Sequence, residues 1–130
     1  MPTLKKAEAD QIILALYQQF HRPEFLEWDP LSVVRRHVKP EEQEWIALLA
    51  ALFAFGGVKQ IIASLNEVLR RLDGSFTHLE DKLAGFRHRI YVGADVAALI
   101  RLYQRTVREH GTIHAHFLSH HPEDALTVEA

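Results

Sequence analysis

Two adjacent glycines and a nearby lysine form the first feature of this sequence that could bind a ligand. Gly56 and Gly57 precede a segment with helical periodicity, and Lys59 falls in the first turn of that expected helix. Unpaired backbone N–H groups, the positive end of the helix dipole and an ammonium group together suit a phosphate or another anion. A tight corner between two helices needs the same glycines for steric reasons. The sequence therefore leaves two interpretations of this turn, an anion site and a structural corner.

A group of arginines is the second feature. The stretch from Phe86 to Arg108 contains five arginines and one acid, Asp95. The arginines are Arg87, Arg89, Arg101, Arg105 and Arg108. At about 100° per residue, the last three fall within a sector about 60° wide, opposite the apolar side of their helix. Because guanidinium groups bind phosphate through paired hydrogen bonds, this pattern predicts contact with a nucleic-acid backbone; the alternative is an ordinary solvated helix face.

Histidines are concentrated near the end of the sequence. The group comprises His110, His114, His116, His120 and His121. The helical spacing of His116 and His120 can place two imidazoles on one metal ion, and Glu123 or Asp124 could add oxygen ligands. We nevertheless expect a histidine-rich surface with no metal and no other cofactor, because no further pattern supports a ligand set.

No complete catalytic set can be recognised in the sequence. Motifs for a Ser-His-Asp triad, a phosphate-binding loop and dinucleotide binding are absent. Asp29 precedes Pro30, a pattern typical of a helix N-cap rather than of a catalytic carboxylate. Whether the chain is an enzyme stays open, and its catalytic residues are unknown at this point.

Composition limits the class of protein. The chain has 130 residues, 48% of them hydrophobic and 25% charged, with a formal net charge of −2 and no cysteine. These values are typical of one soluble domain with a hydrophobic core, and they exclude disulfides, thiolate metal sites and a cysteine nucleophile. The longest nearly apolar run, 45–58, is shorter than the about 20 residues of a membrane helix, and the start lacks the apolar stretch of a signal peptide. We therefore expect a cytoplasmic protein that does not enter a membrane.

Helical periodicity runs through the chain and predicts an all-α domain. The expected helices cover residues 7–20, 30–38, 40–55, 58–72, 77–85, 94–110 and 112–121. The helix over 40–55 is apolar on nearly every side. It should therefore be the buried centre of a single compact bundle of about six to eight helices spanning 1–130, with Leu49 and Leu52 in the core. Residues 86–92 are expected to form a loop, because no partner strand can be recognised elsewhere.

Five short segments carry a family resemblance. They are Asp29–Leu31, Ala47–Gly56, Val58–Ile62, Phe86–Arg89 and Ala94–Val96. In this order they resemble the bacterial family labelled domain of unknown function 2400, over most of residues 24–118. Members of that family are considerably longer than this chain. The resemblance therefore implies a domain that is incomplete at its C-terminus, which agrees with a helix start at 122–124 that only six residues follow.

That family is in turn distantly similar to helix-hairpin-helix DNA glycosylases. In those enzymes a long buried helix, a turn and an amphipathic helix line the pocket for the damaged base, and residues 55–60 would occupy that turn. The glycosylase hairpin, of Leu-Pro-Gly-Val-Gly type, and its downstream catalytic Lys and Asp are not found here. Gly57 also replaces the polar residue expected beside Gly56. The resemblance implies the N-terminal half of a glycosylase-like protein, without self-sufficient catalysis.

Two functions remain open from the sequence. The first is a helical module that binds DNA or another phosphate-bearing ligand through Gly56, Gly57, Lys59, Arg87, Arg89, Arg101, Arg105 and Arg108. The alternative is a helical protein-interaction or structural module, oligomeric and without nucleic-acid binding, whose apolar helices are completed by another protein chain.

Overall fold

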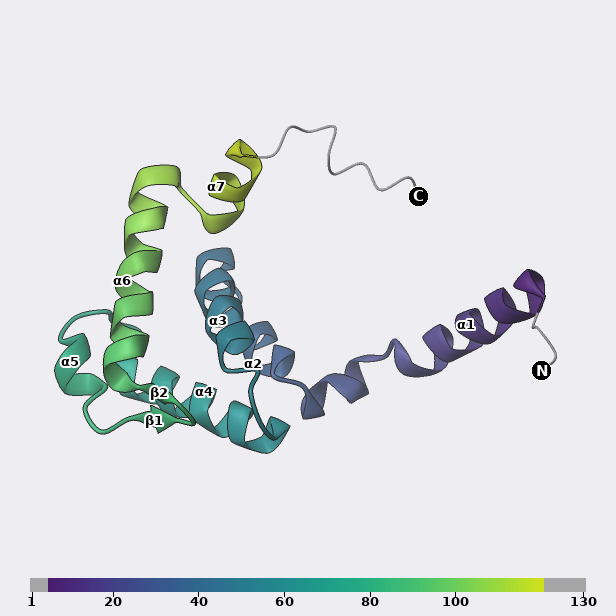
Figure 1. Ribbon diagram of the computed structural model, residues 1–130, viewed down its shortest axis with the longest axis horizontal. Helices are drawn as coiled ribbons and strands as arrows, with labels where there is room; N and C mark the ends of the chain where they lie inside the picture. Colours follow the sequence, from purple (N-terminus) through teal and green to yellow (C-terminus); the bar gives the residue numbers. More distant parts are fainter. Residues whose placement is uncertain (1–4, 121–130) are drawn as a thin grey trace.

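Helices form where apolar residues repeat at helical spacing, and they dominate the computed structural model (Figure 1). The structure describes residues 5–120. The helices are α1 (Lys6–Phe20), η1 (Pro23–Trp28, a 3-10 helix), α2 (Leu31–Arg35), α3 (Pro40–Leu52), α4 (Val58–Leu72), α5 (Leu79–Lys82), α6 (Gly93–His110) and α7 (Ile113–Ser119). Two short strands, β1 (Arg87–His88) and β2 (Tyr91–Val92), make the only sheet among the described residues. The all-α class expected from the sequence is confirmed.

The hydrophobic core lies between α3, α4 and α6. In the view of Figure 1, α3 and α6 run roughly upright and α4 crosses beneath them. Leu49 of α3, Leu65 of α4 and Ile100 of α6 are each no more than 1% exposed. Each of these helices turns one apolar face toward the other two and leaves its polar residues in solvent.

Helix α3 is buried on one face rather than on every side. Trp45, Ile46 and Leu49 point into the core, whereas Leu52 is 41% exposed and Phe55, beyond the helix end, is 58% exposed. The expectation that Leu52 belongs to the core is therefore wrong. Helices α2 and α4 pack on other faces of α3. Leu52 instead borders a groove of about 280 Å³ between α3 and α6, and no described segment fills that groove.

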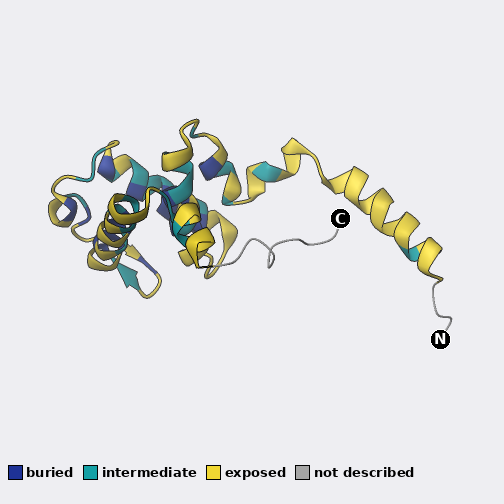
Figure 2. Ribbon diagram, turned by 90° about the horizontal axis from the view of Figure 1, so that it is seen from above, coloured by how far each residue is buried: buried dark blue, intermediate teal, exposed yellow. Residues whose placement is uncertain are grey.

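Helix α1 projects away from the other helices and buries none of its residues (Figures 1 and 2). Its apolar side chains repeat at helical spacing but are between 48% and 64% exposed. The apolar stripe of α1 comprises Ile12, Ile13, Leu16, Tyr17 and Phe20, and Leu14 is exposed beside it. The bundle thus comprises α2 to α7, and α1 lies outside it.

Residues 86–92 form a hairpin and not the expected loop. Arg87 pairs with Val92 and His88 with Tyr91 in an antiparallel register. Arg89 starts the two-residue turn between the strands with a positive φ of 55°. The expectation failed because the partner strand lies within the same short segment and not in another part of the chain.

A buried histidine fastens this hairpin to the helices. His88 is 1% exposed. In the neutral imidazole, Nε2–H donates to the Phe53 carbonyl at 3.0 Å and Nδ1 accepts from the Ser64 hydroxyl at 2.7 Å. The imidazole also stacks on the Phe53 ring, with centroids 4.6 Å apart. Since both ring nitrogens are satisfied, His88 links β1 to the end of α3 and the middle of α4.

Truncation of the core leucine tests the packing of α3. We expect Leu49→Ala to lower the free energy of unfolding by about 2–5 kcal/mol, because it leaves a cavity among side chains that cannot fully close it. Leu52→Ala is the matched control on the exposed side of the same helix and should cost no more than about 1 kcal/mol. Urea unfolding followed by circular dichroism measures both. Equal losses would contradict the one-sided burial of α3.

Removal of the serine hydroxyl tests the histidine contact. We expect Ser64→Ala to lower the free energy of unfolding by about 1–3 kcal/mol, because Nδ1 of buried His88 loses its partner. The loss should appear although alanine has the higher helix propensity. Ser119→Ala, near the exposed end of α7, is the control and should stay within about 0.5 kcal/mol of the unmodified chain. A Ser64→Ala protein as stable as this control would show that the hydroxyl is dispensable.

Candidate functional site

The fold brings two of the predicted anion-binding features into contact. Gly56 has a φ of 112°, and an ideal Cβ placed on it would lie 2.5 Å from Nη2 of Arg89. The guanidinium carbon of Arg89 is also 5.9 Å from the ring centroid of Phe55. The Arg89 side chain therefore lies across the turn that leads into α4. A side chain at position 56 would displace it, so glycine is required here for close approach as well as for the backbone conformation.

The N-terminus of α4 is open beside this contact. Gly57 is the N-cap and supplies no side-chain cap. The N–H groups of Gly57, Val58 and Lys59 donate to no other residue in the range 5–120. An ideal Cβ on Gly57 would meet nothing within 4 Å, so the turn borders open space. Three backbone donors, the positive end of the helix dipole and the Lys59 ammonium in the first turn are thus available to an oxyanion.

Arg87 lies apart from this turn. Its side chain is exposed and borders a shallow pocket of about 390 Å³ together with Glu80 and Gly93. This pocket lies between the hairpin, α5 and the start of α6. Although only two positions separate them in the sequence, Arg87 and Arg89 therefore have different surroundings.

The three arginines of α6 do not present one uniform row of free charges. Arg101 is paired with Glu80 of α5. Nε of Arg105 is 2.9 Å from Oε1 of Glu109, and this hydrogen bond, followed by the arginine's charge, lowers the pKa of the Glu109 carboxyl. Arg108 forms no ion pair with the residues that the structure describes, and it borders a different cavity. Carboxylates thus partly neutralise the predicted stripe.

Three of the five clustered histidines contact one another at the junction of α6 and α7. His110 stacks on His116 with centroids 3.8 Å apart, and His120 meets His116 edge-on at 4.8 Å. Desolvation, followed by repulsion from these two neighbours, lowers the pKa of His116. Within residues 5–120, no three His, Cys, Asp or Glu side chains are placed to share a metal ion. His121, Glu123 and Asp124 lie outside the described residues.

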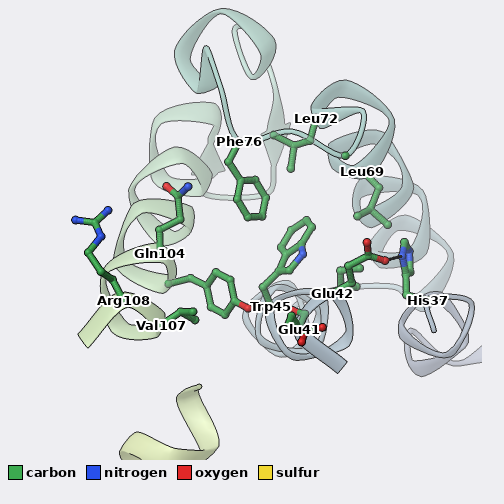
Figure 3. A pocket seen from close by; sticks show the side chains of 13 residues that line it. His37, Glu41, Glu42, Trp45, Leu69, Leu72, Phe76, Gln104, Val107 and Arg108 are labelled. Atoms are coloured by element: carbon green, nitrogen blue, oxygen red, sulfur yellow. Dashed lines mark hydrogen bonds and ion pairs between the residues drawn. The ribbon is translucent and has the colours of Figure 1, made fainter. Parts of the chain in front are cut away.

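An aromatic pocket of about 540 Å³, here named the Trp45 pocket, lies between α3, α4 and α6 (Figure 3). Its aromatic walls are Trp45 of α3, Phe76 from the segment before α5 and Tyr103 of α6. The rings of Trp45 and Phe76 meet edge to face with centroids 5.2 Å apart. The Tyr103 hydroxyl donates to the backbone carbonyl of Glu41 at 3.0 Å, which fixes the position of its ring.

Polar groups surround the rings of the Trp45 pocket. Nδ1 of His37 lies 3.2 Å from Oε2 of Glu42, and Nζ of Lys39 lies 3.7 Å from Oε1 of the same carboxylate. Burial, followed by the negative charges of Glu44 and Glu41, raises the pKa of Tyr103. The α3 side of the pocket is therefore acidic.

The Trp45 pocket cannot be recognised from the sequence. The expected buried helix over 40–55 contains Trp45, but no sequence pattern places Tyr103 or Phe76 beside it. One signal was nevertheless present, because Glu41 and Glu42 precede Trp45 by four and three positions and so share one helix face with it. The other two rings come from distant parts of the sequence and can be assembled only by the tertiary fold.

Across the described part of the chain, no helix combines enough length with enough apolar character to cross a membrane. Searches of curated proteins and of solved structures find no match to the chain. Comparison with models of protein families matches residues 29–129 to the family described as Protein of unknown function (DUF2400). This match covers most of the sequence and agrees with the resemblance seen in its motifs, so the chain belongs to the DUF2400 family.

Proposed function

We propose that this protein binds phosphate groups of a nucleic acid, or of a smaller phosphate-bearing ligand, at the corner formed by Gly56, Gly57, Lys59 and Arg89, here named the α4 corner. The observation that carries the proposal is the position of the Arg89 guanidinium on Gly56, beside an uncapped helix N-terminus. A phosphate at this corner receives hydrogen bonds from backbone N–H groups and charge from arginine and lysine.

The absence of a side chain at Gly56 and Gly57 favours a large, charged ligand. Backbone donors can be reached closely only where no Cβ intervenes, and open space borders Gly57. Arg89 can offer two N–H groups in a planar fork, which matches two phosphate oxygens better than an ammonium does. The α4 corner thus offers both backbone and side-chain donors to one oxyanion.

The arginines outside the corner extend this proposed surface. The pairs of Arg101 with Glu80 and of Arg105 with Glu109 are exposed, and such pairs contribute little to stability because water screens them. Arg101 and Arg105 can therefore exchange their carboxylate partner for a phosphate oxygen at little cost. Arg87 and Arg108 have no carboxylate partner among the described residues. The distant similarity of the family to DNA glycosylases supports nucleic acid as the ligand, with binding and not base excision as the activity of this chain.

Binding to labelled DNA as a function of salt tests the proposal. We expect fluorescence anisotropy to show an affinity that falls as salt rises from about 50 to about 200 mM, because phosphate contacts release counterions. Arg89→Gln should weaken binding and make the slope of log affinity on log salt shallower by about one. Arg70→Gln removes one exposed charge from the other end of α4 and is the matched control.

Two results would count against the α4 corner. The first is unchanged binding in Arg89→Gln, which would place the contacts elsewhere. The second is an equal loss in Arg70→Gln, which would indicate a diffuse effect of net charge. Inorganic phosphate should compete with DNA for the unmodified chain but much less for Arg89→Gln, which separates a localised oxyanion site from a general electrostatic surface.

A second candidate function is self-association through α1, and the exposed apolar face of that helix favours it. An isolated helix of 15 residues is marginally stable in water, so α1 gains stability when its stripe is covered. Lys5 and Lys6 precede the stripe, and Glu24 and Glu27 follow it. Two copies packed antiparallel would bring Lys5 and Lys6 of one chain near Glu24 and Glu27 of the other, so a second copy is the occupant that we propose.

Sedimentation equilibrium tests the self-association. We expect a dimer, and we expect Leu16→Glu to shift it to a monomer because the new carboxylate would be buried in the helix pair. Gln18→Glu adds the same charge on the opposite side of α1 and should leave the dimer intact. A monomer at all concentrations, or equal effects of the two variants, would contradict this candidate.

A further inference from the structure

We propose that the Trp45 pocket binds an organic cation, an ammonium group that carries apolar substituents. This site is separate from the α4 corner and takes a ligand of opposite charge. Rings of Trp, Tyr and Phe carry negative potential on their faces, so a set of aromatic walls attracts a cation whose substituents also need apolar surroundings. The Trp45 pocket combines all three ring types with aliphatic side chains (Figure 3).

The pocket is organised before any ligand enters. Trp45 is 9% and Tyr103 7% exposed, so neighbouring groups hold both rings. The Tyr103 hydroxyl is fixed by its hydrogen bond to the Glu41 carbonyl, and the edge-to-face contact orients Phe76 against Trp45. Leu69, Leu72 and Val107 complete the apolar lining. A volume of about 540 Å³ falls in the ordinary range for small-molecule sites and exceeds what a single water or metal ion needs.

The charges around the rings select a cation. Glu41 lines the pocket and has no cationic partner among residues 5–120. Glu44 lies outside the lining and its Oε1 accepts from the His114 N–H, but its Oε2 is buried with no hydrogen-bond partner in the described part of the chain. Both carboxylates lie close enough to act on the Tyr103 hydroxyl. His37 and Lys39 both contact the Glu42 carboxylate, and Arg108, the other cation of the lining, points its guanidinium away from the three rings in Figure 3. An anionic ligand would meet the uncompensated carboxylate of Glu41, and a neutral ligand would leave that charge unneutralised.

Tryptophan fluorescence tests this site directly. The chain has two tryptophans, and Trp28 is 68% exposed, so Trp28→Phe leaves Trp45 as the only fluorescent indole. The probe is choline, and the control ligand is neohexyl alcohol, in which a carbon atom replaces the quaternary nitrogen. We expect saturable binding of choline and at least about tenfold weaker binding of the alcohol, because only the cation is attracted by the rings and carboxylates.

Variants then separate the two sources of attraction. Phe76→Leu keeps an apolar side chain but removes a ring, and Glu41→Gln removes a charge; each should weaken choline binding by at least about fivefold and leave the alcohol unchanged. Phe76→Tyr keeps the ring and should retain binding. Glu27→Gln removes a distant exposed carboxylate and should have no effect. Thermal unfolding of every variant establishes that the fold is retained.

Three outcomes would overturn the proposal: no saturable binding of either choline or a trimethyllysine peptide, equal binding of the cations and the alcohol, or equal weakening by Glu41→Gln and Glu27→Gln. A short peptide that carries trimethyllysine is a third titrant. Saturation by either cationic probe, with failure of the alcohol, supports the site. The order of their affinities shows whether a free ammonium compound or a methylated side chain fits better.

Discussion

The buried imidazole of His88 connects three segments of the chain, namely α3, α4 and the hairpin. One ring nitrogen donates to the carbonyl of Phe53, just after α3, and the other accepts from the Ser64 hydroxyl in the middle of α4. The backbone of His88 belongs to the hairpin. Each strand of the hairpin has only two residues, so the hairpin is not stable in isolation. The position of Arg89 on Gly56 therefore depends on a hydrogen-bonded histidine in the interior, and the α4 corner is shaped by a residue that no ligand touches.

Local signals could be predicted from the sequence, and contacts between distant residues could not. The extent of α4 follows from its apolar spacing and from the Gly56-Gly57 and Asp73-Gly74 pairs at its ends, since such signals act over a few residues. The open N-terminus of α4 was predictable for the same reason. The contact between Ser64 and His88 spans 24 positions, and no periodicity reveals it. Likewise, the exposure of Leu52 depends on which helices pack against α3, and the sequence of α3 does not contain that information.

Each of the two proposed sites lies near a helix N-terminus, which favours negative charge, but the negative charge comes from the chain at one site and from the ligand at the other. At the start of α3, Glu41 and Glu42 occupy the first turn, so the chain itself supplies the anions that a helix N-terminus favours. At the start of α4 no acid occupies the first turn and no side chain caps the helix, so the corresponding position remains available to an external anion. The acids of α3 in turn make one side of the Trp45 pocket negative. One surface of the molecule thus attracts anions and another attracts cations, although the net charge of the chain is close to zero.

Arg89 occupies a backbone position that suits glycine better than arginine. Its φ of 55° lies in the left-handed region, which costs an ordinary L-residue about 1–2 kcal/mol and costs glycine almost nothing. Arginine at this position in the turn therefore destabilises the hairpin relative to glycine. Laboratory evolution for thermostability alone would favour glycine at this position, and it would thereby produce a more stable protein that has lost its cation beside Gly56.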